Sequence, residues 1–151
     1  MRVISGSAKG KKLISSKSRE IRPTSDKVKM AIFNILRHGV INFDFNGCYT
    51  LDLFSGSGSL GIESLSRGSE FCFFLDISHG SHQVCKKNLQ SCGFTHHSAN
   101  RIWDIRKKKP FFVENKFDLI LADPPYGSEY PKNILEFVKK NDLLKANGVL
   151  V

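Results

Sequence analysis

The stretch Leu51–Leu65, LDLFSGSGSLGIESL, decides the fold of this chain. It begins within an apolar run, Cys48–Phe54, passes through Ser55–Gly58 and then takes on helical spacing. A strand, a glycine turn and a helix form a nucleotide-binding corner, because glycines permit close approach and the helix start offers unpaired N–H groups. The stretch alone leaves a dinucleotide as open as S-adenosylmethionine, since G-x-G-x-x-G is also satisfied by Gly56, Gly58 and Gly61.

The composition indicates one globular domain. The chain has 151 residues, of which 40% are hydrophobic and 25% charged. Its apolar runs, such as Phe71–Leu75, are too short to cross a bilayer, and Met1–Gly6 contains no signal-peptide core. We therefore expect a cytoplasmic monomer without a membrane or metal site. No C-x-x-C pair exists, so small buried hydrophobes are predicted at all four cysteines, Cys48, Cys72, Cys85 and Cys92.

The net charge of +9 is concentrated at the N-terminus. Residues 1–40 hold ten Lys or Arg and two acidic residues, which gives +8, whereas the other 111 residues hold 13 basic and 12 acidic side chains. A charge run is usually only a solvated face. So uneven a distribution favours a polyanionic partner, and nucleic acid fits better than a membrane because no basic amphipathic helix with a large apolar face begins the chain.

The first forty residues predict a hairpin and a helix. Short β-prone pieces at Arg2–Ser5 and Lys11–Ile14 surround a glycine-bearing loop, and Ser15–Ile21 reads as a second loop. Thr24 or Ser25 then caps a helix that Gly39 ends. Helical spacing predicts a buried stripe of Val28, Ile32, Ile35 and Leu36, with the cations Lys27, Lys29 and Arg37 elsewhere on the helix surface.

From Cys48 onward, strands alternate with helices. This rhythm predicts an α/β, Rossmann-like, mostly parallel sheet with helices on both faces. The expected strands are Cys48–Phe54, Phe71–Asp76, Asn100–Trp103, Phe117–Ala122 and a fifth starting at Gly148, and the expected helices are Leu60–Arg67, His79–Cys92 and Tyr130–Lys140.

Polar residues stand where each of the first four strands ends. In a doubly wound sheet, ligands bind beyond the carboxyl ends of the strands. A single Asp after a strand is more often a cap or turn residue, but four at corresponding positions favour a ligand site. The four signals are Asp52 with Ser55–Gly58, Asp76 twenty residues after Gly56, Asp104, and Asp123–Tyr126.

The segment Asp123-Pro124-Pro125-Tyr126 favours methyl transfer to an amine. Two prolines stiffen the backbone, and the Asp123 carboxylate with the Pro124 carbonyl can accept the hydrogens of an exocyclic amino group and orient its lone pair. Tyr126 can stack on an extruded base. Without the upstream glycine turn, the segment would read as a rigid surface turn.

The sequence resembles a known family. Leu51–Gly58 resembles motif I of the class I S-adenosylmethionine-dependent methyltransferases, and Asp123–Tyr126 matches the (Asp/Asn)-Pro-Pro-(Tyr/Phe) motif of amino-methylating members. Further likeness to the bacterial RsmD-type family, which methylates N2 of a guanine in small-subunit (16S) ribosomal RNA, lies in Ile4–Gly6, Lys9–Leu13, Arg22–Thr24, Phe33–Leu36 and Leu60–Gly68.

This resemblance implies roles for individual residues. It implies S-adenosylmethionine binding by Asp52, Phe54, Ser55, Gly56, Ser57, Gly58, Asp76, Ile77, Asp104, Ile105 and Asp123. Asp76 stands where the family usually has a ribose-binding Glu, and Asp104 where an Asp meets the adenine amino group. Catalytic handling of the guanine falls to Asp123, Pro124, Pro125 and Tyr126. The RNA, free or in an assembling small subunit, would be held by Arg2, Lys9, Lys11, Lys12, Arg22, Lys27 and Tyr126.

The resemblance also implies a division of the chain. Residues 1–40 would be an RNA-holding extension of a methyltransferase core at 41–151. The family pattern continues for two more strands, so the sheet of this sequence is expected to be truncated at its fifth strand. Three alternatives remain open at this point. They are a methyltransferase of another amine such as DNA adenine or protein glutamine, an NAD-dependent oxidoreductase, and a catalytically inactive RNA-binding remnant.

Overall fold

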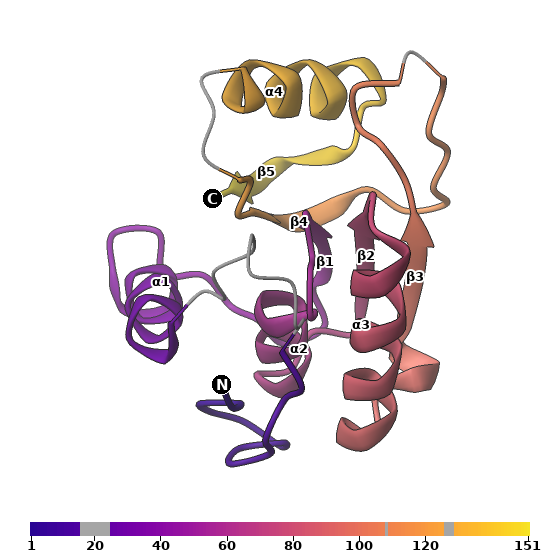
Figure 1. The fold of residues 1–151 in the computed structure, drawn as a ribbon. Helices are drawn as coiled ribbons and strands as arrows, with labels where there is room; N and C mark the ends of the chain where they lie inside the picture. The colour runs from indigo at the N-terminus through magenta and orange to yellow at the C-terminus, as the bar shows by residue number, and fades with distance from the viewer. Residues whose placement is uncertain (16–24, 108, 126–128) are drawn as a thin grey trace.

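The computed structural model describes residues 1–15, 25–107, 109–125 and 129–151 (Figure 1). Its five strands form one sheet in the order β3-β2-β1-β4-β5, and every neighbouring pair is parallel. The elements in chain order are α1 (Asp26–His38), β1 (Tyr49–Leu53), α2 (Ser59–Ser66), β2 (Phe71–Asp76), α3 (His79–Cys92), the short 3₁₀ helix η1 (Thr95–His97), β3 (Ser98–Ile102), β4 (Phe117–Ala122), α4 (Tyr130–Lys140) and β5 (Leu144–Leu150). The chain leaves β1 in one direction for β2 and β3 and returns on the other side for β4 and β5, as in a doubly wound sheet.

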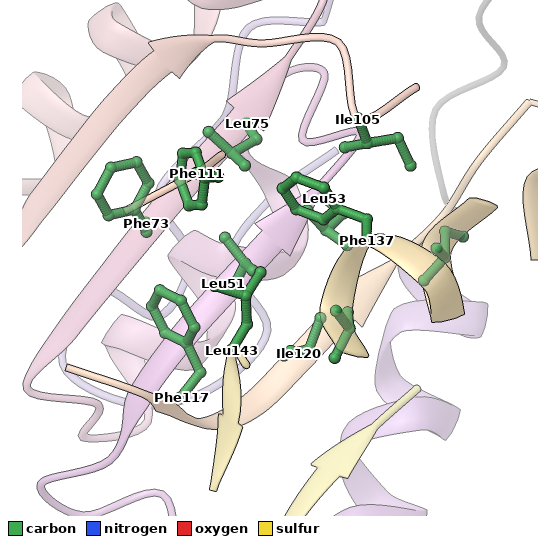
Figure 2. Packing of buried hydrophobic residues seen from close by; sticks show 12 residues of the cluster. Leu51, Leu53, Phe73, Leu75, Ile105, Phe111, Phe117, Ile120, Phe137 and Leu143 are labelled. Carbon is green, nitrogen blue, oxygen red and sulfur yellow. The ribbon is translucent and has the colours of Figure 1, made fainter. Parts of the chain in front are cut away.

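Helices cover both faces of this sheet (Figure 1). Side chains alternate along a strand, so Leu51 and Leu53 face a cluster that includes Ile134 and Phe137 of α4 (Figure 2). Thr50 and Asp52 face the opposite way, toward α2. On that side, α1, α2 and α3 contribute Phe33, Leu36, Leu60, Ile62, Leu65, Cys85 and Leu89 to two further clusters.

Most predicted elements are confirmed, and the differences lie at their ends. The strands β2 and β4 and the helices α3 and α4 have the predicted bounds, while β1, α2 and β3 differ by one or two residues at their ends. The largest difference is β5, which begins at Leu144 and not at Gly148. Its pairing with β4 shifts register between Phe117 and Leu119. Residues 145–148, which break the apolar pattern of the sequence, therefore lie in an irregular part of the strand.

The N-terminal pairing is confirmed, but it is short. Arg2 and Lys12 form an isolated antiparallel bridge, flanked by a hydrogen bond from the Val3 N–H to the Lys11 carbonyl (3.0 Å). Gly6, with φ +82°, brings the loop against the end of α2, where a side chain would collide with the Ser66 carbonyl. The Ser7 N–H donates to that carbonyl at 2.8 Å. Apart from Ser15, the predicted loop at Ser15–Ile21 lies outside the described residues.

The buried face of α1 differs from the predicted stripe. Ser25 caps the helix and Gly39 ends it, as expected. The buried residues, however, are Lys29, Phe33 and Leu36. Val28 is 51% exposed and Ile35 is 65% exposed. The prediction is confirmed for Leu36 and for the partly buried Ile32 and is wrong for Val28 and Ile35. It counted Lys29 as a surface cation, which moved the expected apolar stripe toward the neighbouring face.

Lys29 is buried because acidic and carbonyl oxygens surround its ammonium group. Its Nζ donates to the Arg2 carbonyl at 2.6 Å and lies 3.8 Å from carboxylate oxygens of both Asp26 and Glu63. Burial lowers the pKa of Lys29, and the two carboxylates oppose this effect. Three segments of the chain therefore meet at one buried charge.

Glu63 on α2 is the counterpart of Lys29. Its carboxylate is fully buried and accepts the backbone N–H groups of Ile4 (2.8 Å) and Ser5 (3.0 Å). It also accepts from Nε of Arg67 at 2.8 Å. This single side chain joins the hairpin and α1 to α2.

The cysteine prediction is confirmed for three of four residues. Cys48, Cys72 and Cys85 are buried, whereas Cys92 is partly exposed. Burial raises the pKa of the Cys72 and Cys85 thiols well above the ordinary value, which keeps both groups neutral.

Replacing Glu63 by Ala should destabilise the protein by about 3–5 kcal/mol, because Lys29 would stay buried without its buried carboxylate partner and would keep only the half-buried Asp26. Urea unfolding measures the change in free energy. The control is Glu136→Ala, which removes an exposed pair with Lys132 on α4 and should cost less than about 1 kcal/mol. Equal losses in both variants would contradict the central role of Glu63.

Candidate active site

The glycine turn joins the end of β1 to the start of α2. Gly56 (φ +52°) and Gly58 (φ +80°) have left-handed backbone conformations, and Gly58 is the N-cap of α2. A Cβ at Gly58 would lie 2.7 Å from the Cys85 sulfur, and one at Gly61 would collide with the Phe74 ring. A Cβ at Gly56 would have no atom nearer than 3.9 Å. The later two glycines are thus required for packing, while Gly56 leaves the outer side of the turn open to a ligand.

Asp76 at the end of β2 holds this turn in place. Its Oδ2 accepts the Gly56 N–H and its Oδ1 accepts the Ser78 N–H, each at 2.8 Å. The position of Asp76 in the sequence predicts ribose binding by this carboxylate. Each oxygen keeps further acceptor capacity, so the observed bonds are compatible with that role.

Asp52 lies inside the protein beneath the turn. Its Oδ2 accepts the N–H of Gly61 on α2 at 2.9 Å, and its side chain is shielded from solvent. Burial raises the pKa of Asp52 to about 7, and the charges of Asp76 and Asp123 act in the same direction, although the hydrogen bond from Gly61 opposes them. Asp52 thus supports the start of α2 and is placed to shape the site from behind.

The end of β3 contributes to a hollow of about 290 Å³. Ile77, Ile102, Trp103, Asp104, Lys107 and Lys109 line this hollow. Asp104 is bound by Arg106 through two hydrogen bonds of 2.9 Å, which lower the pKa of the carboxyl. The predicted residue Ile105 does not line the hollow, because its side chain packs into the core beside Leu53 and Phe137 (Figure 2).

Asp123 follows β4 at the same edge of the sheet. Leu53 of β1 pairs with Ala122 of β4. The next residues along the two strands, Phe54 and Asp123, therefore leave the sheet side by side, and Phe54 leads into the glycine turn. Asp123 and Pro125 are exposed and Pro124 is partly buried. Tyr126 lies outside the described residues. The structure thus brings together the ends of β1, β2, β3 and β4 that the sequence singles out.

Only some of the predicted RNA-binding cations line the same hollow. A second hollow, of about 390 Å³, lies between the hairpin and α1, and Arg2, Lys9 and Lys27 are among its lining residues. Lys11 and Lys12 are exposed but do not line it. Arg22 lies outside the described residues.

Two buried polar residues at the site were missed by the sequence analysis. Nδ2 of Asn88 on α3 donates to the carbonyls of Ser57 (2.9 Å) and Ile14 (3.0 Å), and its Oδ1 accepts the Ile14 N–H at 2.8 Å. Nζ of Lys29 donates to Oγ of Ser59, the first residue of α2, at 3.1 Å. Both residues tie the N-terminal segment to the glycine turn. Their only sequence signal is a polar residue at helical spacing from apolar neighbours.

The described residues contain no cluster of three or more His, Cys, Asp or Glu side chains that could hold a metal ion. No helix among them is both long and apolar enough to cross a membrane.

Sequence similarity extends over the whole chain. The family Cons_hypoth95, described as conserved hypothetical protein 95, matches residues 1–151. The chain belongs to this family. It is 40% identical over 157 residues to YlbH of Bacillus subtilis, with coverage of 100% of this chain and 80% of YlbH. It is 32% identical over 154 residues to the ribosomal RNA small subunit methyltransferase D of Haemophilus influenzae, with coverage of 99% and 76%. Membership of Cons_hypoth95 and these relatives confirm the resemblance to the RsmD-type family.

Solved structures share the fold seen in this member of the Cons_hypoth95 family. The Escherichia coli protein yhhF has a TM-score of 0.80 at 23% identity, with coverage of 99% of this chain and 78% of that chain. The Haemophilus influenzae protein HI0767 has a TM-score of 0.75 at 27% identity and the same coverage. The predicted Rossmann-like class I methyltransferase fold is confirmed.

The raised pKa of Asp52 makes stability depend on pH. The folded pKa of about 7 lies above the ordinary aspartate pKa of 3.8, so protonation of Asp52 favours the folded state. This contribution is complete below about pH 4 and is lost as the pH rises through 7. Asn cannot ionise, so Asp52→Asn should gain stability relative to the parent by up to about 1.4 kcal/mol per pH unit between pH 5 and 7, and level off above 8. Urea unfolding at pH 5, 6, 7 and 8 tests this.

The matched control is Asp44→Asn, since Asp44 is an exposed carboxylate paired with Arg37. Its unfolding free energy should follow the parent's over the same pH range. Parallel curves for Asp52→Asn and the parent would show that Asp52 is ionised throughout.

Proposed function

We propose that this chain transfers a methyl group from S-adenosylmethionine to the N2 amine of a guanine in small-subunit ribosomal RNA. The observation that carries the proposal is the position of Asp123-Pro124-Pro125 beside the glycine turn, where β1 and β4 end together. The relative from Haemophilus influenzae bears the name of a small-subunit ribosomal RNA methyltransferase, which supports the substrate class. Membership of the same family favours methyl transfer over the hydride transfer that G-x-G-x-x-G leaves open.

The residues around the turn fit S-adenosylmethionine. Gly56 leaves space on the ligand side, and Oγ of Ser55 is a buried polar atom for which no hydrogen-bond partner exists among the described residues. Such an atom is suited to a ligand that completes its bonding. At the other end, Ile77 and Ile102 offer apolar walls for an adenine ring, and Asp104 offers an acceptor for its amino group. Asp76 lies between these two parts of the site.

The bound cofactor would supply an electrophilic methyl group on a sulfonium centre. The chain's contribution is placement and electrostatics. Asp123 and the Pro124 carbonyl would accept the two N2 hydrogens, which aligns the nitrogen lone pair with the methyl carbon. Methyl transfer would form the C–N bond as the C–S bond of the cofactor breaks, which leaves S-adenosylhomocysteine, and Asp123 would pass one N2 proton to solvent.

The N-terminal segment would hold the RNA. Arg2, Lys9 and Lys27 surround one hollow, and Lys11 and Lys12 extend the positive surface along the hairpin. Their phosphate contacts would add affinity without base specificity. The most direct test of the whole proposal is mass-spectrometric mapping of N2-methylguanine in ribosomal RNA from cells with and without the gene. An identical set of modified guanines in both kinds of cell would contradict the proposed function.

Asp123→Ala should abolish methyl transfer while the affinity for S-adenosylmethionine stays within a few fold of the parent. The reason is that the lost group orients the acceptor nitrogen. Single-turnover methylation of small ribosomal subunits and calorimetry measure the two quantities. The control is Glu114→Ala, an exposed carboxylate outside the proposed site. Unchanged turnover in Asp123→Ala would exclude the assigned role.

The triple variant Lys9→Glu, Lys11→Glu, Lys12→Glu should bind ribosomal RNA at least tenfold more weakly and with a smaller salt slope, because phosphate contacts release counterions. Filter binding at several salt concentrations provides both values. The matched control reverses Lys86, Lys87 and Lys139, which are exposed on α3 and α4. A salt slope equal to the parent's would show that the three lysines are solvated and make no phosphate contacts.

A further inference from the structure

A second basic segment connects β3 to β4, far from residues 1–40 in the sequence. Residues 103–116 contain five Lys or Arg and two acidic residues. Figure 1 shows this connection rising past the ends of β2 and β3 toward α4, whereas the N-terminal hairpin lies beside α2 at the other side of the sheet. The proposed function leaves this second segment without a role.

Of the described lysines in this connection, Lys116 pairs with Asp142, but two others have no ion-pair partner within the described part of the chain. Arg106 is neutralised by Asp104, but Lys107 and Lys109 are exposed and form no ion pair with any described residue. Both line the hollow that contains Asp104. S-adenosylmethionine would not satisfy them, because it has no phosphate and its carboxylate would lie at the glycine turn. Two unpaired lysines beside the cofactor site therefore suit a different, polyanionic ligand.

The same connection presents an aromatic ring to solvent. Phe112 is 81% exposed and is the only aromatic residue among the described large hydrophobics that are exposed. Its neighbour Phe111 is buried, and its ring centroid lies 5.6 Å from those of Phe73 and Phe137, two residues that Figure 2 shows beside it. The Phe111 ring also lies 5.2 Å from the ring of Trp103. The Phe111 N–H also donates to Oδ1 of Asn141 at 2.9 Å. The backbone that carries Phe112 is thus anchored to the core, so that the ring is held outward.

We propose that Lys107, Lys109 and Phe112 form a second RNA-binding surface beside the cofactor hollow. The two ammonium groups would bind phosphates, and the Phe112 ring would stack on an unpaired base near the target guanine. Exposed cations next to an anchored aromatic ring are the combination that single-stranded RNA requires. This inference rests on the proposed function, since it adds a contact for the same substrate.

Separate variants test the two kinds of contact. Binding to 16S ribosomal RNA transcribed in vitro is measured across a salt series. Lys107→Gln with Lys109→Gln should weaken binding at least fivefold and reduce the slope of log K against log salt by about 1.5, because each phosphate contact contributes about 0.7–0.9. Phe112→Ala should weaken binding about tenfold without a change in slope, and Phe112→Trp should restore it, because stacking is independent of counterions.

Matched controls separate local contacts from general effects. Lys86→Gln with Lys87→Gln removes the same charge from α3, and Leu135→Ala removes a 60% exposed side chain from α4. Both should bind RNA within twofold of the parent. Phe112→Ala and the two controls should bind S-adenosylmethionine as the parent does, as measured by calorimetry, and the lysine double variant should lose less affinity for S-adenosylmethionine than for RNA, because its two side chains also line the cofactor hollow. Losses as large in the controls, unchanged RNA binding in both test variants, or a loss confined to S-adenosylmethionine would overturn the proposal.

The failure of this inference is distinguishable from failure of the proposed function. If the parent methylates small ribosomal subunits but the test variants bind RNA like the parent, only the second surface is wrong. If the parent transfers no methyl group and the test variants still lose RNA affinity as expected, the RNA-binding surface is supported and the proposed reaction is contradicted. A parent that binds no ribosomal RNA would overturn both.

Discussion

The structure depends on the buried carboxylate of Glu63. It accepts two backbone N–H groups of the hairpin and Nε of Arg67, and it lies within 3.8 Å of the Lys29 ammonium group. A buried charge is tolerated only when such partners replace water. Because these partners come from the hairpin, α1 and α2, the basic N-terminal segment is attached to the sheet. Lys29 and Asn88 extend this attachment to Ser59 and Ser57 at the glycine turn, so the segment proposed to hold RNA is joined to the residues proposed to hold the cofactor.

The parallel register places negative groups at one edge and positive groups around it. Asp76 ends β2, and Asp104 and Asp123 follow β3 and β4. Asp52 is buried, with a pKa raised to about 7. Mutual repulsion is part of the cause of that raised pKa. An acidic centre suits a cofactor with a sulfonium cation, and basic surfaces at the hairpin and beyond β3 suit a polyanionic substrate. The two ligands of the proposed reaction thus match opposite charges on neighbouring parts of one edge.

The pattern of apolar and polar residues predicted the helices and strands well where the whole signal lies within one segment. The continuous apolar runs of β2 and β4 and the capped helix α3 appear with the predicted bounds, because each signal is contained within its own segment. The prediction failed where a distant partner decides the outcome. Lys29 is buried because Glu63 lies opposite it, and β5 begins at Leu144 because its register with β4 shifts. Ile105 turns into the core because Leu53 and Phe137 provide an apolar surface there.

The sequence by itself determined the fold class, the glycine turn and the order of the polar strand ends, because periodicity, glycine conformation and motif spacing are properties of neighbouring residues. Only the tertiary structure decided that Asp52 supports α2, that Asp76 holds Gly56, and that Lys29 and Asn88 join the N-terminal segment to the turn. These roles depend on contacts between residues 9 to 31 positions apart, and hydrogen bonds and desolvation act through space and not along the chain.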